Sequence, residues 1–275
     1  MSVYSINSNR LNTIYEIDGT ATLKGYDILA NEVFPNEEPV DPYLPDRTLV
    51  FEDDFNGQSL NTENWSCVVR AGNTGQLQYY KQENVYLEDG KLVIEAKKEP
   101  YEGYAWTSGR IESRNKKYWR FGRIEAKIKF PKLTGAFPAF WTMGQNNLPN
   151  PQCGEIDIVE IMPRGNPEID KVFATMWNCS TGANLGTQYI RTSSIDDWHI
   201  YSMEWTNEYV AILFDNTEFH RWTFSDYANE EIARYLENQY LIFNLAIGTQ
   251  GGTPATETDS MKMFVDWVRV YAPLT

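Results

Sequence analysis

Residues Arg123–Phe130 read Arg-Ile-Glu-Ala-Lys-Ile-Lys-Phe, so that polar and apolar side chains alternate at every position. Successive side chains of a β-strand point to opposite faces, and this alternation therefore predicts a strand with one buried face. Segments of similar character follow one another on both sides, between Leu49 and Tyr271. The further predicted strands are Leu49–Phe55, Gln76–Tyr80, Val85–Glu88, Lys91–Ala96, Ala136–Met143, Glu155–Met162, Val172–Asn178, His199–Trp205, Val210–Phe214, Tyr240–Ile247 and Lys262–Tyr271.

Asp89-Gly90 separates two of these strands and predicts a tight hairpin, because glycine accepts the positive φ that such a turn requires. The main exception to the strand pattern is Ser225–Glu237, which is polar, rich in helix formers and predicts one short helix. Many short strands joined by turns are typical of an all-β sandwich or jelly roll. Strands do not alternate with long helices, which argues against a parallel α/β fold.

Residues 1–46 differ in composition from the rest of the chain. Between residues 31 and 46, Pro35, Pro39, Pro42 and Pro45 interrupt an acidic stretch, which predicts an extended linker. We therefore expect an N-terminal extension of unknown role at 1–46 and one folded domain at 47–275, a length that all-β domains commonly reach.

The composition narrows the class of partner. The formal net charge is −14, whereas nucleic-acid binding relies on a basic surface. The same charge disfavours a polyanionic polysaccharide, so we expect a neutral polymer as the partner. We also expect the protein to be a monomer. Aromatic residues make up 14% of the chain. Most of them must pack between sheets, but several Trp side chains are candidates for stacking against flat sugar faces.

No apolar run in the sequence is long enough to span a bilayer, so no membrane partner is expected. Met1–Ser5 lacks the basic and apolar regions of a signal peptide. We expect an extracellular protein from which a signal peptide has been removed, with a cytoplasmic protein as the alternative. Cys67, Cys153 and Cys179 allow at most one disulfide and have no metal-site spacing, so we expect buried free thiols.

Three carboxylates occur in the segment Cys153–Met162, on the predicted strand Glu155–Met162. In a regular strand Glu155 and Asp157 share one face, whereas Glu160, five positions after Glu155, points to the other face and into the core. Burying an unpaired carboxylate costs several kcal/mol. A β-bulge at Ile158-Val159 would add one residue to the strand and return Glu160 to the face of the other two acids.

Three acids in one row cannot all ionise freely, so at least one pKa is expected to rise. Retaining glycoside hydrolysis uses such an arrangement, with an ionised nucleophile and a protonated acid roughly 5–5.5 Å apart. The spacing does not say whether Glu155 or Glu160 is the nucleophile. A solvated acidic strand face and a calcium site are the alternative interpretations.

Gly154–Glu160 resembles the E-x-D-x-x-E signature of the bulged branch of glycoside hydrolase family 16. Other segments resemble conserved blocks of that family in the same order along the chain. These segments are Leu49–Gly57, Gln76–Tyr80, Phe121–Ile128, Phe137–Trp141 and Phe264–Tyr271.

The resemblance implies a jelly roll of two stacked antiparallel sheets with an open cleft on its concave face. It implies that Glu155 is the nucleophile, Glu160 the acid/base and Asp157 an assisting carboxylate. The blocks are most similar to those of laminarinases, endo-1,3-β-glucanases of which some accept mixed β-1,3-1,4-glucan. The alternatives are a hydrolase of another polysaccharide such as agar or carrageenan, and a non-catalytic β-glucan-binding module.

The resemblance also suggests sugar contacts, although the chain departs from the laminarinase pattern in two places. Trp177 stands where many laminarinases have a His, and Gly248–Gly252 lacks the usual Trp. The predicted substrate contacts are Trp141, Trp106, Trp177, Arg110, Arg123, Gln78 and Asn73.

No cofactor is expected for catalysis. The family often carries one structural calcium ion on the convex face, and Asp266 matches its usual carboxylate ligand. Asp54 and the carbonyl group of Gly90 are predicted to join Asp266, since oxygen ligands suit Ca²⁺.

Overall fold

The computed structural model describes the backbone of residues 3–5, 14–17 and 23–26, and the residues 47–162, 171–192 and 194–273. The chain divides into two units, Met1–Pro45 and Asp46–Thr275. The first unit contains an antiparallel sheet of the strands β1 (Val3–Ser5), β2 (Ile14–Ile17) and β3 (Leu23–Tyr26). The sequence predicts only an N-terminal extension of unknown role here, and the proline-rich stretch 31–46 predicted as a linker lies outside the described residues.

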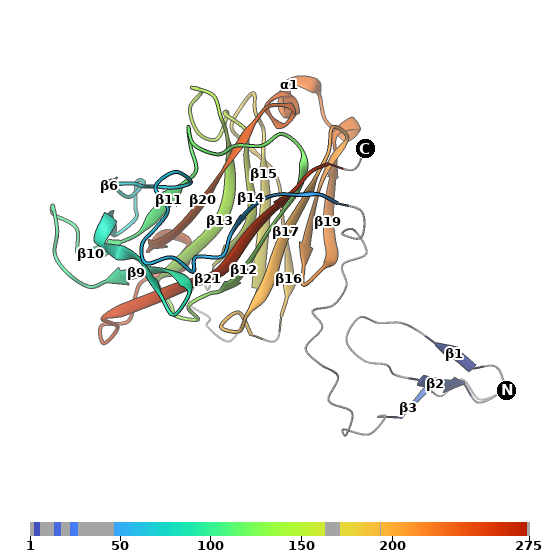
Figure 1. The fold of residues 1–275 in the computed structure, drawn as a ribbon, viewed down its shortest axis with the longest axis horizontal. Helices are drawn as coiled ribbons and strands as arrows, with labels where there is room; N and C mark the ends of the chain where they lie inside the picture. The colour runs from blue at the N-terminus through green and yellow to red at the C-terminus, as the bar shows by residue number, and fades with distance from the viewer. Residues whose placement is uncertain are drawn as a thin grey trace. The chain divides into compact units, whose positions relative to one another are not determined.

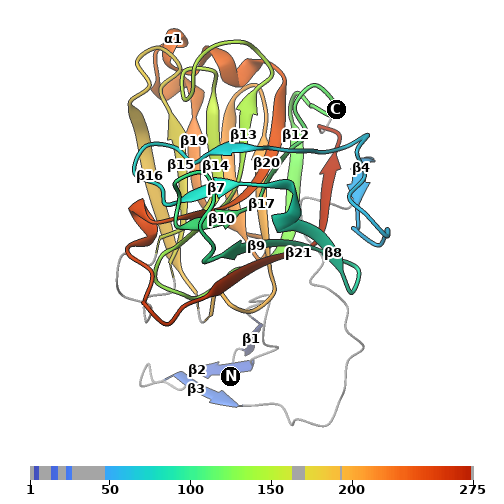
Figure 2. The ribbon, with the colours of Figure 1, turned by 90° about the vertical axis from the view of Figure 1, so that its left-hand side faces the viewer.

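The second unit contains two sheets. The seven-stranded sheet has the order β16-β15-β14-β13-β20-β11-β5, and Figure 2 shows β16, β15, β14 and β13 side by side. Its strands are β5 (Ser66–Cys67), β11 (Arg110–Glu112), β13 (Ala136–Gly144), β14 (Glu155–Ile161), β15 (Lys171–Trp177), β16 (Asn184–Arg191) and β20 (Gln239–Ile247).

The eleven-stranded sheet has the order β19-β18-β17-β12-β21-β9-β10-β7-β6, with β4 paired to β21 and β8 paired to β9. Its strands are β4 (Leu49–Asp53), β6 (Arg70–Ala71), β7 (Gln78–Tyr80), β8 (Val85–Glu88), β9 (Lys91–Lys97), β10 (Trp106–Ser108), β12 (Gly122–Lys129), β17 (His199–Trp205), β18 (Tyr209–Phe214), β19 (Thr217–Thr223) and β21 (Ser260–Tyr271).

The hydrophobic core joins the inner faces of the two sheets. Ile124 and Val268 of the eleven-stranded sheet belong to the same buried cluster as Ile156 and Phe243 of the seven-stranded sheet. The rings of Phe140 and Phe243 stack within it, with centroids 4.4 Å apart. The two sheets therefore pack face to face as the layers of a jelly roll (Figure 1), as the sequence predicts.

The twelve predicted strands are all present, with ends that differ by a few residues. The two longer strands of this unit that the sequence does not predict are β16 and β19, and each is the edge strand of its sheet. Their residues are mostly exposed or half-buried. A strand with so little buried surface lacks the apolar alternation on which prediction depends.

The single helix predicted at Ser225–Glu237 is wrong. The structure has three short elements there, η2 (Phe224–Asp226), α1 (Asn229–Ile232) and η3 (Ala233–Leu236). The carbonyl group of Glu231 accepts the N–H of Cys179 at 2.8 Å, and that of Tyr235 accepts the indole N–H of Trp205 at 2.9 Å. These tertiary bonds occupy carbonyl groups that would otherwise continue a helix.

The three cysteines are free thiols, with Cys153 and Cys179 buried and Cys67 half-buried. None of the helices in the described part of the chain is long and apolar enough to cross a bilayer.

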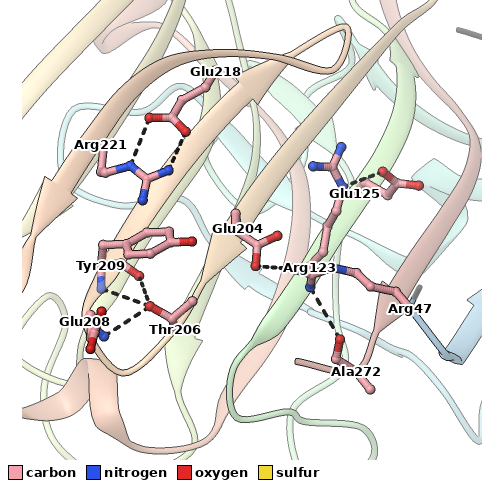
Figure 3. Close-up of polar contacts among 10 residues, drawn as sticks. All are labelled: Arg47, Arg123, Glu125, Glu204, Thr206, Glu208, Tyr209, Glu218, Arg221 and Ala272. Atoms are coloured by element: carbon pink, nitrogen blue, oxygen red, sulfur yellow. Dashed lines mark hydrogen bonds and ion pairs between the residues drawn. The ribbon is translucent and has the colours of Figure 1, made fainter. Parts of the chain in front are cut away.

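The beginning of the second unit is fastened to its end by Arg47. Figure 3 shows the guanidinium group of Arg47 between the carboxylate of Glu204 on β17 and the carbonyl oxygen of Ala272, which lies 3.3 Å away. The side chains of Arg47 and Glu204 are only 1% and 3% exposed. The ion pair between Arg221 and Glu218 in the same view is more exposed.

We expect Arg47→Met to lower the free energy of unfolding by about 3–5 kcal/mol, because it leaves the buried Glu204 carboxylate without this partner. The matched change Arg221→Met breaks a half-exposed pair and is expected to cost less than about 1 kcal/mol. Chemical denaturation at neutral pH measures both values. Equal losses for the two variants would contradict this account.

Candidate active site

Strand β14 carries one extra residue where the sequence predicts it. Across from β13, Glu160 pairs with Ala139, Val159 with Phe140 and Asp157 with Trp141. Ile158 is therefore left without a partner on β13, and the pairing with β15 shifts at the same place. The predicted β-bulge at Ile158-Val159 is confirmed.

The bulge places the carboxylates on one face of the sheet. Ile158 and Val159 are adjacent in sequence, yet both are fully buried in the core. Glu155, Asp157 and Glu160 all line one cavity with a volume of about 520 Å³. We call this cavity the cleft.

The other walls of the cleft come from the strands on both sides of β14. One wall includes Trp141 of β13, Asn244 of β20 and Arg110 of β11, with Tyr80 of β7 beyond them. The opposite wall includes Phe173, Thr175 and Trp177 of β15 and Thr187 of β16.

Asp157 is a buried carboxylate that accepts a hydrogen bond from an indole group. The indole N–H of Trp177 donates to its Oδ2 atom at 2.8 Å. Burial raises the pKa of Asp157 to about 7, although the hydrogen bonds with Trp177 and Glu155 work in the opposite direction.

Glu155 lies beside Asp157, and its pKa is raised as well. Burial and the neighbouring Asp157 raise the pKa of Glu155 well above its ordinary value, while Asn150 and Arg110 lower it. The Asn150 side-chain amide donates to Oε2 of Glu155. A buried and a half-buried carboxyl group that interact in this way share one proton near neutral pH.

We expect Asp157→Asn to raise the melting temperature at about pH 8 and to leave it unchanged at about pH 3.5. The folded-state pKa of about 7 lies above the ordinary value of 3.8. The folded protein therefore binds this proton more tightly than the unfolded chain does, and the resulting stabilisation is fully present below pH 3.8. This contribution is lost as the pH rises through 7, and Asn has no charge to bury.

Scanning calorimetry at the two pH values measures the effect, with Asp226→Asn as the control at an exposed carboxylate. A lower melting temperature of Asp157→Asn at about pH 8 would contradict the assignment.

Trp141 and Arg110 form one rigid wall of the cleft. The Arg110 guanidinium lies over the Trp141 ring, 4.8 Å from its centroid. The Trp141 indole donates to Oδ1 of Asn244 at 2.7 Å, and Nε of Arg110 is 3.3 Å from the Glu112 carboxylate. The Trp141 hydrogen bond and the Arg110 ion pair hold an aromatic face and a cation beside the carboxylates.

The structure brings four of the seven predicted substrate contacts into the cleft, namely Trp141, Trp177, Arg110 and Asn73. The predictions for Trp106, Arg123 and Gln78 are wrong. Trp106 is 4% exposed and belongs to the core. Arg123 is 0% exposed and bonds Glu125 and Ser202 within the eleven-stranded sheet.

Gln78 is also fully buried, and its side chain bonds the main chain and a neighbouring residue. Its Oε1 atom accepts the N–H of Ile247 at 2.8 Å, and its Nε2 atom donates to Gln76 at 2.9 Å. Gln78 therefore links β7 to β20 and does not face the cleft.

Tyr235 is a buried residue beside the site that the sequence pattern does not reveal. Its hydroxyl group is 2.9 Å from the carbonyl oxygen of Glu155 and accepts the N–H of Trp177 at 2.9 Å. Gly154 has a φ of +95°, and a Cβ atom there would lie 2.8 Å from Cβ of Arg234. The short η3 element thus packs against the start of β14 and fixes the backbone of Glu155 and Trp177.

The residues predicted to bind calcium do not fit that ion as they stand. The Lys127 ammonium lies 3.3 Å from one carboxylate oxygen of Asp266 and the Lys91 ammonium 4.0 Å from the other. Oδ1 of Asp54 accepts the N–H of Asn56. A calcium ion at Asp266 would have to displace two ammonium groups.

A jelly roll with paired carboxylates in an open cleft is the architecture of a polysaccharide-cleaving glycoside hydrolase. The family model described as glycosyl hydrolases family 16 matches residues 73–269. The chain therefore belongs to glycosyl hydrolase family 16.

The chain is also similar to individual members of known function. It is 35% identical to the clotting factor G alpha subunit of Tachypleus tridentatus over 82% of its own length, but spans only 34% of that protein. It is 31% identical to a beta-glucanase of Rhodothermus marinus, covering 82% of this chain and 86% of the relative. The solved laminarinase of Flavobacterium sp. UMI-01 superposes with a TM-score of 0.74 at 34% identity, over 82% of this chain and all of that one.

Proposed function

We propose that residues 47–275 form an endo-acting, retaining β-glucan hydrolase that cleaves β-1,3 and mixed β-1,3-1,4 glucans. The observation that carries the proposal is the β14 bulge, because it brings Glu155, Asp157 and Glu160 into the same cleft. The names of the relatives, a beta-glucanase and a laminarinase, support the substrate class.

In the first step, Glu160 donates its proton to the glycosidic oxygen as the bond to C1 breaks. The Glu155 carboxylate attacks C1 and forms a covalent glycosyl-enzyme ester. For this attack Glu155 must be ionised, and the shared proton then resides on Asp157. The hydrogen bond between the two groups raises the pKa of Glu155 and lowers that of Asp157, so this step requires the shared proton to move from Glu155 to Asp157.

In the second step, the Glu160 carboxylate accepts a proton from water, and the resulting oxygen nucleophile attacks C1. The ester bond to Glu155 breaks, and the product leaves with the configuration of the original linkage. Asn150 donates a hydrogen bond to Glu155 in the free enzyme and helps to orient the leaving carboxylate.

A reducing-sugar assay on laminarin, barley β-glucan, agarose and κ-carrageenan tests the substrate class. We expect release from laminarin and barley β-glucan, because similar proteins include a beta-glucanase and a laminarinase. We expect none from agarose, or from κ-carrageenan, whose sulfate groups the strongly acidic chain disfavours. Release only from agarose or carrageenan would replace the glucan assignment. Binding to laminarin without release from any polymer would indicate a non-catalytic module.

We expect Glu160→Ala to lower kcat by roughly 10²–10⁴-fold, the usual contribution of a general acid, and Glu155→Ala to lower it at least as far. Azide should restore turnover of an activated aryl glycoside by Glu155→Ala and yield an α-glycosyl azide, because azide replaces the missing nucleophile. Nuclear magnetic resonance of the product determines its anomeric configuration.

Glu230→Ala removes an exposed carboxylate outside the cleft and serves as the control. The same α-azide product from Glu160→Ala instead of Glu155→Ala would reverse the two roles.

We further propose that the protein acts as a monomer outside the cell, where polymeric glucans are encountered. Size-exclusion chromatography with light scattering checks the monomer, and fractionation of the producing cells checks the location.

A further inference from the structure

A row of side chains continues the cleft beyond its catalytic strand. Glu160 on β14 pairs with Phe173 on β15, and Phe173 pairs with Tyr189 on β16. Phe173 lines the cleft, and its ring centroid lies 5.6 Å from that of Tyr189. The row therefore leads from the proposed acid/base to the edge strand of the seven-stranded sheet.

The Tyr189 side chain lies on the cleft face of β16. Ile190, its neighbour in sequence, packs against the core on the opposite face. Thr187, two positions before Tyr189, lines the cleft and is 3.0 Å from the Thr175 hydroxyl group of β15. Because Ile190 faces the core and Thr187 faces the cleft, the Tyr189 side chain faces the cleft side of the sheet.

Tyr189 is held in place but remains open to a ligand. The Lys171 ammonium lies 4.3 Å from the centroid of its ring, and Phe173 contacts it from the side. Half of the side chain, 50%, is still exposed. A large aromatic ring that is fixed by two neighbours presents a flat apolar surface at little further entropy cost.

We propose that Tyr189, together with Phe173, forms a distal sugar-binding subsite of the cleft that stacks on the pyranose face of a neutral β-glucan. This proposal rests on the proposed function. The C–H bonds of an equatorially substituted pyranose form a flat apolar face that matches an aromatic ring. The Lys171 ammonium lies over one face of the ring, so the sugar stacks on the opposite face.

The strand spacing indicates which sugar Tyr189 contacts. Neighbouring strands lie about 4.8 Å apart, so Phe173 is one spacing from Glu160 and Tyr189 is two spacings, roughly 10 Å. Glu160 must reach the oxygen of the bond that breaks. Phe173 then lies under the sugar next to that bond, and Tyr189 under a sugar farther along the chain.

The test is the chain-length dependence of KM for laminari-oligosaccharides. For Tyr189→Ala we expect KM for laminarin and long oligosaccharides to rise by roughly three- to tenfold, the effect of losing one aromatic contact. The rise should shrink as the oligosaccharide becomes too short to reach β16, and kcat should change little because the contact is equally present in ground and transition states. Tyr189→Phe keeps the ring and should restore most of the affinity.

Tyr118→Ala provides the matched control, because Tyr118 is 48% exposed and does not line the cleft. An active enzyme in which Tyr189→Ala and Tyr118→Ala have the same KM at every chain length would overturn the subsite. If the unmodified protein hydrolyses no glucan, the proposed function fails. Retardation of the two variants in a laminarin-containing native gel then still decides whether Tyr189 binds the polymer.

Discussion

The extra residue in β14 is the constraint on which the site depends. In a regular strand Glu160 would replace Val159 among the buried side chains, and burying an unpaired carboxylate costs several kcal/mol. The bulge instead buries Ile158 and Val159 together. Its cost is one residue without a partner on β13, and the two buried aliphatic side chains offset that cost. Core packing therefore selects the register that also assembles the carboxylates.

The same strand concentrates negative charge that the protein compensates only in part. Asp157 receives an indole N–H and Glu155 an amide N–H, while the guanidinium of Arg110, whose charge lowers the pKa of Glu155, lies over Trp141. Neutral donors stabilise a carboxylate less than a paired cation does. Burial raises the pKa values of Glu155 and Asp157, and these neutral donors oppose that rise only in part. A fully paired site would fold more stably, but it would hold its nucleophile in an ion pair.

Residues an even number of positions apart on a regular strand lie on the same face. This rule made the fold and the bulge predictable from the sequence. The rule does not show which of the two sheets a strand joins. Arg123 lies on the opposite face of β12 from the core residue Ile124, as the alternation predicts. However, β12 belongs to the eleven-stranded sheet, so that face does not line the cleft. Trp106 and Gln78 pair with each other between β10 and β7, and both are covered by the rest of the fold.

Residues that reach the site from distant segments could not be predicted by any local pattern. Tyr235 lies in a short turn 80 positions from Glu155, and only the folded chain brings its hydroxyl group to that backbone. Tyr189 lies on a mostly polar edge strand that the sequence pattern does not predict. One wall of the cleft, around Trp141, is fixed by buried hydrogen bonds. The other wall ends at the edge strand β16, where side chains can change without disturbing the core, and substrate preference can therefore diverge there while the carboxylates stay in place.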